Sequence, residues 1–151
     1  MSRSTLYTWA AITFLASCVF EMYGINGGAY EYYGPHALRV FGYPLVIGVL
    51  ETAQVVCFSW AATELRKRMT GPSASLLLFV LFPCVFYFAN FGAGAPTIIA
   101  LHLADPSPGI VAAASTVSIV FAISLIWMVA HAQAQTVAGR NALDARVAGH
   151  A

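Results

Sequence analysis

The sequence carries very little charge for a chain of 151 residues. Only 9% of its residues are Asp, Glu, Lys or Arg, whereas 60% are hydrophobic, and the mean hydropathy is +0.76. Soluble domains contain about 25% charged and about 45–50% apolar residues, so this composition excludes them and indicates an integral membrane protein. The net charge of +1 provides no electrostatic basis for binding nucleic acid.

Cysteine is also scarce, and several familiar motifs are missing. The three cysteines, Cys18, Cys57 and Cys84, have no CxxC spacing. Their odd number indicates neither a disulfide framework nor a zinc site, and we expect them to pack inside apolar runs. The sequence contains no clear internal repeat, phosphate-binding loop or nucleic-acid motif. We expect no metal and no cofactor.

Four apolar runs are long enough to cross a membrane as helices. They cover about residues 6–23, 40–65, 75–91 and 109–130. The first run, which follows Arg3, has some features of a signal peptide. Since it continues beyond Cys18, we interpret it as a retained helix. We therefore predict an all-α integral membrane protein with one membrane domain, residues 1–151, built as a bundle of four transmembrane helices.

The basic residues predict how this bundle is oriented. Six of the seven lie on one side of the four predicted helices: Arg3, Arg66, Lys67, Arg68, Arg140 and Arg146. Only Arg39 lies on the other side. The positive-inside rule then places both termini in the cytoplasm, and we expect a bacterial cytoplasmic (inner) membrane. The external loops are 24–39 and 92–108, the second with a short interfacial or re-entrant helix, and 131–151 form a cytoplasmic tail.

Ionisable side chains gather toward the external side, and one lies deeper. Counting about 1.5 Å per residue from residue 40 places Glu51 about 16 Å down its helix, near the bilayer centre. An ionised carboxylate there costs several kcal/mol, so we expect Glu51 to face the bundle interior and to be protonated or paired. Gln54 is three residues away and extends a polar stripe on the same face. A protonated glutamate that only joins two helices is the structural alternative.

The first external loop is rich in tyrosine and glycine. Five tyrosines, Tyr23, Tyr30, Tyr32, Tyr33 and Tyr43, lie near the outer interface, where aromatic belts are common. Four glycines between residues 24 and 34 allow the loop to fold back tightly over the helix ends. The loop is therefore either part of an interfacial belt or a lid over a polar pocket.

Residues 21–51 resemble a segment of bacterial polytopic membrane proteins that tailor isoprenoids and polyketides. In carotenoid-hydratase-like proteins, an acidic residue closes one helix, and a glycine- and tyrosine-rich loop leads into a helix beginning with a G-x-P-L-type sequence. The matching residues here are Glu21, Gly24, Gly28, Tyr30, Tyr32, Gly34, Phe41, Gly42, Pro44 and Leu45. The portion YYGPHALRVFGYPL, residues 32–45, is also similar to actinobacterial spirocyclase-like proteins.

This resemblance implies a membrane enzyme that acts on an apolar terpenoid, polyketide or lipid by proton transfer. The reaction would be a cyclisation, a hydration or an isomerisation. Proteins of these families usually have more than four spans, so the chain resembles a reduced member or one that completes its pocket with a second copy. The expected partners are an apolar small molecule, membrane lipids and a possible second copy of the chain.

The candidate catalytic residues are Glu51, Glu21, Tyr30, Tyr32, His36 and Arg39. We expect Glu51 or Glu21 to act as a proton donor that stays neutral until it is used. The aromatic rings would stabilise a cationic intermediate. His36 would relay protons to external water, and Arg39 would neutralise a carboxylate, for which Glu31 is near in sequence. The candidate substrate-binding residues are Tyr33, Gln54, Asn90 and His102.

Two other classes of function fit the same sequence. The chain could be a non-catalytic lipid-binding protein or a small subunit of a membrane complex, because residues 109–124 offer a close-packing face of small side chains. It could also be a small dimeric transporter in which Glu51 is the coupling carboxylate. The grouping of polar residues outside the membrane argues against transport.

Overall fold

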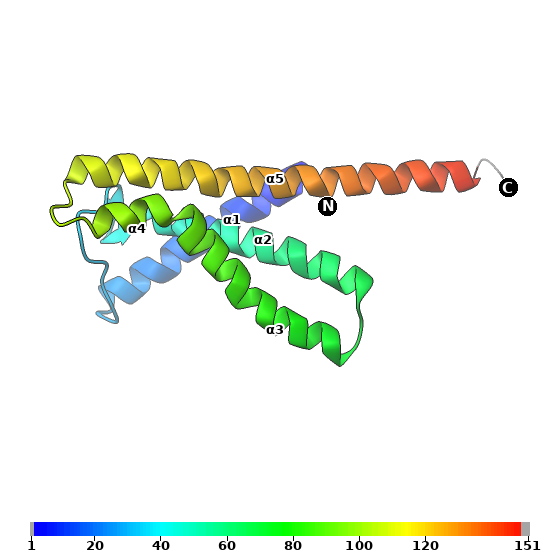
Figure 1. Ribbon diagram of the computed structural model, residues 1–151, viewed down its shortest axis with the longest axis horizontal. Coiled ribbons are helices and arrows are strands. Elements are labelled where there is room, and N and C mark those ends of the chain that lie inside the picture. Colours follow the sequence, from blue (N-terminus) through cyan, green and yellow to red (C-terminus); the bar gives the residue numbers. More distant parts are fainter. Residues whose placement is uncertain (1, 149–151) are drawn as a thin grey trace.

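The structure, a computed structural model, describes the backbone of residues 2–148 and the side chains of residues 2–135. It is mostly helical, with one small β-hairpin (Figure 1). In chain order, the elements are α1 (Arg3–Asn26), β1 (Arg39–Val40), β2 (Tyr43–Pro44), α2 (Leu45–Arg68), α3 (Pro72–Phe86), the π-helix η1 (Tyr87–Ala93), α4 (Ala95–Leu101) and α5 (Pro108–Ala148).

Within the described part of the chain, four helical segments are long and apolar enough to cross a membrane. They are Arg3–Asn26, Leu45–Arg68, Pro72–Ala93 and Pro108–Gln135. The four predicted apolar helices are thus confirmed by length and composition, although every boundary moves by a few residues. The short helix predicted in the second external loop is also present, as α4.

The predicted start of the second helix is wrong. Residues 39–44 form an antiparallel hairpin in which Arg39 pairs with Pro44 and Val40 with Tyr43, so α2 begins only at Leu45. The two turn residues have positive φ angles, 49° at Phe41 and 82° at Gly42, as a type I′ turn requires. Glu51 therefore lies about 9 Å along its helix, not 16 Å, and is nearer the outer end.

The fourth helix extends into the predicted tail. The sequence predicts a helix over 109–130 and an Ala-rich tail over 131–151 that could extend it as a helix, and the backbone of α5 is helical to Ala148. Residues 149–151 lie outside the described part of the chain. The predicted tail is thus largely a continuation of the helix.

α2 is the central helix of the structure. It contacts α1, α3, η1 and α5, and α4 packs on α5 and η1. The core consists mainly of small and aliphatic side chains from α1, α2 and α5, among them Leu6, Val46, Ala53, Ala122 and Val129. Figure 1 shows α3 diverging from α5 as it leaves η1. The core is therefore thickest where α1, α2 and α5 meet.

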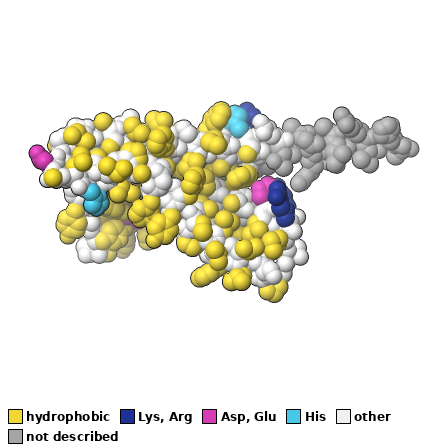
Figure 2. Space-filling view, in the orientation of Figure 1, with side chains coloured by type: hydrophobic (Ala, Val, Ile, Leu, Met, Phe, Trp, Pro, Cys, Tyr) yellow, Lys and Arg dark blue, Asp and Glu magenta, His cyan; other side chains and the backbone are white. Residues whose placement is uncertain are grey.

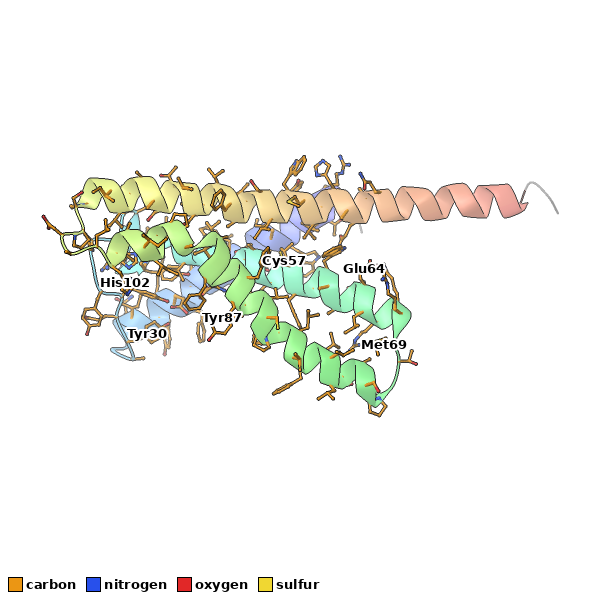
Figure 3. The ribbon with its side chains drawn as sticks, in the orientation of Figure 1. Tyr30, Cys57, Glu64, Met69, Tyr87 and His102 are labelled. Carbon is orange, nitrogen blue, oxygen red and sulfur yellow. The ribbon has the colours of Figure 1, made fainter. Side chains whose placement is uncertain are left out.

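The two ends of the molecule differ in character. The N-terminus and the α2–α3 turn lie toward one end, while the residue 27–44 loop and the α4–α5 connection lie at the other (Figure 1). Figure 2 shows Lys and Arg near the first end and hydrophobic side chains over much of the visible face. Figure 3 shows Glu64 and Met69 at this end and Tyr30 and His102 at the opposite one. This is the arrangement that the predicted topology requires.

Candidate functional site

The C-terminal part of α1 presents a carboxyl group to two tyrosines of the following loop. Tyr30 Oη donates a hydrogen bond to Glu21 Oε2 at 2.7 Å, and Tyr32 Oη donates to the same oxygen at 2.9 Å. Gly24 makes room for this contact, because a Cβ atom there would lie 2.8 Å from Tyr30 Oη. The spacing of Glu21 and Gly24, one helical turn apart, therefore seats a tyrosine on the carboxyl group.

A second carboxyl group lies deeper, between α1 and α2. Glu51 Oε2 accepts a hydrogen bond from Ser17 Oγ on α1 and another, of 3.2 Å, from Tyr43 Oη on β2. The Tyr43 side chain is completely buried. The expectation that Glu51 faces the bundle interior is confirmed, and its hydrogen-bond partners are hydroxyl groups.

Tyr32 connects the two carboxyl groups through aromatic contacts. Its ring centroid lies 6.1 Å from that of Tyr30 and 5.8 Å from that of Tyr43, both in edge-to-face geometry. Glu21 and Glu51 therefore belong to one continuous group of side chains. We call this group the carboxyl–tyrosine cluster, and it consists of Ser17, Glu21, Tyr30, Tyr32, Tyr43 and Glu51.

The tyrosines of this cluster are held in the protonated form. The hydrogen bond to Glu21 raises the pKa of Tyr30 to about 12. Burial, followed by the hydrogen bond to Glu21 and the charges of both carboxylates, raises the pKa of Tyr32 well above its ordinary value. Burial also raises the pKa of Tyr43, and the charge of Glu51 adds to the effect while Ser17 opposes it. Near neutral pH these phenols are therefore hydrogen-bond donors.

The predicted role of Arg39 as a partner of a carboxylate is wrong. Its Nη2 donates to the backbone carbonyl of Tyr32 and, at 2.8 Å, to that of Gly34. Gly34 has a φ of 91°, which turns the chain so that both carbonyls face Arg39. Among the described residues, the ion pair between side chains is Lys67–Glu64, which lies at the opposite end of the molecule from Arg39. Arg39 thus fastens the tyrosine loop and leaves both carboxyl groups of the cluster to the hydroxyls.

His36 lies beside the cluster. Its ring meets that of Tyr32 edge-on, with centroids 6.4 Å apart. Burial, and then the charge of Arg39, lowers the pKa of His36 from its ordinary range. The imidazole is therefore neutral near physiological pH, and its role as a proton relay stays a prediction.

The predicted polar stripe of Glu51 and Gln54 is wrong. Glu51 turns toward α1, whereas Gln54 Oε1 accepts a hydrogen bond of 2.8 Å from Asn90 Nδ2 on η1. Asn90 Nδ2 also donates to the carbonyl of Phe86 at 3.1 Å. Two of the four predicted substrate-binding residues thus form an interhelical amide pair on the other side of α2.

The other two predicted substrate-binding residues also lie outside the cluster. Tyr33 is 79% exposed, and a hydrogen bond with Glu31 raises its pKa. His102 follows the end of α4, with Nδ1 at 2.8 Å from the carbonyl oxygen of Ile98. Both contacts are local, and the structure gives neither residue a contact with the cluster.

Sequence reasoning missed the role of Ser17 and assigned none to Tyr43. Ser17 precedes Glu21 by four residues and so shares its helix face, a signal that was present in the sequence. A second polar group was also missed: Thr97 on α4 contacts Ser118 on α5, with 2.9 Å between their hydroxyl oxygens. Both residues are buried, so this contact fixes α4 against α5.

Two apolar cavities flank α2. One, of 390 Å³, lies between α1, α2 and α5, and the other, of 320 Å³, lies between α2, the α3–η1 segment and α5. None of the ten predicted site residues lines either one. Among the described residues, no three His, Cys, Asp or Glu side chains group closely enough to hold a metal ion.

Comparisons with known proteins found no match that bears on this site. No protein-family model, curated protein or solved structure matches the chain. The resemblance of residues 21–51 to membrane tailoring proteins therefore stays a prediction, and the geometry of the cluster is what supports a function.

Proposed function

We propose that this chain is a membrane-embedded enzyme that acts on an apolar terpenoid, polyketide or lipid by proton transfer. One observation carries the proposal: two carboxyl groups from neighbouring helices belong to a single cluster with three tyrosines. General acid–base catalysis needs a titratable side chain that is positioned within hydrogen-bond reach of the proton it transfers, and the hydroxyl contacts hold both carboxyl groups in place. The reaction class is a cyclisation, a hydration or an isomerisation.

In this proposal the two carboxyl groups have different tasks. Glu51 lies deeper and gives its proton to an alkene or carbonyl of the substrate, which becomes a cation. The rings of Tyr32 and Tyr43 stabilise that cation. Loss of a neighbouring C–H proton then gives an isomer, attack by an internal alkene followed by the same loss gives a ring, and addition of water followed by loss of one of its protons gives an alcohol. In each case the released proton returns to the Glu51 carboxylate. Glu21, nearer the surface, exchanges protons with external water, and His36 assists.

The orientation of the molecule is part of the proposal. The basic residues Arg66, Lys67 and Arg68 end α2, and the positive-inside rule assigns this end, together with both termini, to the cytoplasm. The cluster would then face the external side of a bacterial cytoplasmic membrane. Substrate would reach it from the lipid.

Complementation tests this assignment without knowledge of the substrate. The gene is deleted in the cell that produces the protein, and apolar extracts are compared by mass spectrometry after return of the wild type, Glu51→Gln, Glu21→Gln or Glu31→Gln. Glu31 is the matched control, because it is a carboxyl group of the same loop outside the cluster. We expect the wild type and Glu31→Gln to restore the product. Glu51→Gln and Glu21→Gln should not restore it, although each variant protein is as abundant as the wild type. Full restoration of the product by both Glu51→Gln and Glu21→Gln would refute the assignment.

A second candidate function is a non-catalytic subunit or a lipid-binding protein. The observation that favours it is the low burial of α1 and α3, since only 11% of each span is buried, compared with 39% for α2. Such faces contact lipid, a second copy or another protein. In that case the deletion leaves no missing product, and affinity purification in mild detergent recovers a stable larger complex.

The transporter alternative differs in how water reaches the cluster. A variant with Ser17→Cys, in a chain whose three native cysteines are replaced by Ala, is labelled with membrane-impermeant thiol reagents from each side. An enzyme with an external site should be labelled from the outside alone. Labelling from both sides would support alternating access and transport.

A further inference from the structure

One face of α1 joins the carboxyl–tyrosine cluster to the larger apolar cavity. Tyr7, Ala10, Phe14, Ser17 and Glu21 follow at intervals of three and four residues, so they lie in one stripe along the helix. The first three line the 390 Å³ cavity. The last two belong to the cluster. The stripe therefore changes from apolar to polar within a single turn, between Phe14 and Ser17.

α2 meets this stripe at Gly48. Val49 and Thr52 line the cavity, and Glu51, about 100° around the helix from Thr52, accepts its hydrogen bonds from Ser17 and Tyr43. Gly48 marks the boundary, because a Cβ atom there would meet the Phe14 ring at 3.1 Å and Tyr43 Oη at 3.1 Å. The Phe14 ring and the Tyr43 hydroxyl thus approach each other over Gly48. Phe14 therefore lies where the cavity meets the hydroxyl groups that donate to Glu51.

The cavity is suited to a hydrocarbon chain. Its lining is almost entirely apolar, and its volume falls within the range of about 300–1,000 Å³ that is typical of small-molecule sites. Two of its lining residues on α5, Ile123 and Trp127, remain 54% and 53% exposed. An apolar molecule can therefore enter sideways from the membrane without crossing the polar loop.

We propose that this cavity binds the hydrocarbon chain of the substrate, with the reacting end at Glu51 and Phe14 at the junction between the two. This inference rests on the proposed function and adds a substrate class, an extended molecule with an apolar tail and one reactive end. The tail would point toward the α2–α3 end of the molecule. The 320 Å³ cavity is lined by residues of α2, α3, η1 and α5 and by none of α1, so the stripe that leads to the carboxyl–tyrosine cluster does not reach it.

Photolabelling tests the binding step separately from the chemistry. The probe is a long-chain alcohol with a diazirine near the end of its chain, bound to the purified full chain in lipid nanodiscs. Labelled peptides are mapped by mass spectrometry. We expect label on the inner half of α1 and on the α2 segment around residues 49–52, well above the label on the lipid-facing side of α3.

Two phenylalanine substitutions provide the matched comparison. Ala11→Phe adds a ring at the edge of the cavity, and Ala16→Phe adds the same ring to a groove on the outer face of α1. We expect cavity labelling to fall roughly tenfold in the first variant, as for a pocket that loses room for its ligand, and to be unchanged in the second. Ile123→Phe, which reaches the cavity from α5, serves as the alternative if Ala11→Phe is poorly folded.

The possible results separate this inference from the proposed function. Even labelling of all lipid-facing helices, or equal labelling in both phenylalanine variants, would overturn the cavity assignment. Glu51→Gln should leave the labelling unchanged, because the tail site does not need the carboxyl group. Cavity labelling together with full complementation by Glu51→Gln and Glu21→Gln would refute the chemistry and leave the binding site standing.

Discussion

The two sides of α2 each combine a polar contact with an apolar cavity, but the chemistry of the contacts differs. Toward α1, Glu51 accepts hydrogen bonds from Ser17 and Tyr43 on the side of the 390 Å³ cavity. Toward η1, Gln54 accepts one from Asn90 on the side of the 320 Å³ cavity. An amide pair does not titrate, whereas a carboxyl group exchanges protons. Two polar contacts three residues apart on α2 thus differ in whether they can exchange a proton.

The largest expected difference between the two sides is in activity. Glu51→Gln should lower product formation by about 10²–10⁴-fold, the usual contribution of general acid–base catalysis. Gln54→Met removes the amide contact on the other side and should leave product formation close to the wild-type level. Both are measured as product per amount of protein in isolated membranes. Equal losses in the two variants would abolish the distinction.

The next effect concerns packing around Gly48. Gly48→Ala brings a methyl group within 3.1 Å of both Phe14 and Tyr43, and overpacking of this kind typically costs about 1–3 kcal/mol. Gly92→Ala in η1 is the matched control, because its nearest neighbour, Phe88, would be 3.9 Å away. Thermal unfolding in detergent should show a loss for the first variant and little change for the second. A stable Gly48→Ala protein would mean that the two aromatic rings are free to shift.

A smaller effect is expected from the amide pair itself. A double-mutant cycle with Gln54→Met and Asn90→Leu should give a coupling energy of about 0.6–1.7 kcal/mol, as measured for hydrogen bonds between transmembrane helices. The measurement is the free energy of unfolding in mixed micelles. A coupling near zero would show that the pair does not hold η1 against α2.

The smallest effect is the pH dependence of the cluster side. Burial keeps folded His36 neutral, whereas the unfolded chain takes up a proton near the ordinary pKa of 6.5. The unfolded state then binds more protons below this pH, so stability should fall as the pH decreases through and below about 6.5. His36→Gln should make this decline shallower, and Gln54→Met should leave it unchanged. Identical pH profiles for all three proteins would contradict the role of burial at His36.

Several features were predictable because they depend on stretches of sequence. The four apolar helices follow from length and hydropathy alone, and α4 follows from an apolar stretch bounded by glycine and proline. The hairpin over residues 39–44 was not predictable in this way. Its mostly apolar residues run directly into α2, so hydropathy shows one continuous segment, and only the turn at Phe41 and Gly42 divides it.

The contacts of individual side chains were much less predictable. Glu51 and Gln54 differ by about 60° around α2, close enough to predict a shared stripe. That angle is nevertheless sufficient to direct one residue to α1 and the other to η1. Arg39 likewise seemed suited to a carboxylate, but the turn of the loop at Gly34 brings two carbonyl groups closer.

The sequence alone determined the four helical segments that are long and apolar enough to cross a membrane, because these depend on the amount of apolar surface in each consecutive stretch. It also concentrated carboxyl groups and tyrosines in one segment, residues 21–51. Tertiary structure decided which of them meet. Ser17, Tyr43 and Glu51 come from three different elements, and their approach depends on the rotation of α1 against α2 and on the space that Gly48 leaves between two aromatic side chains.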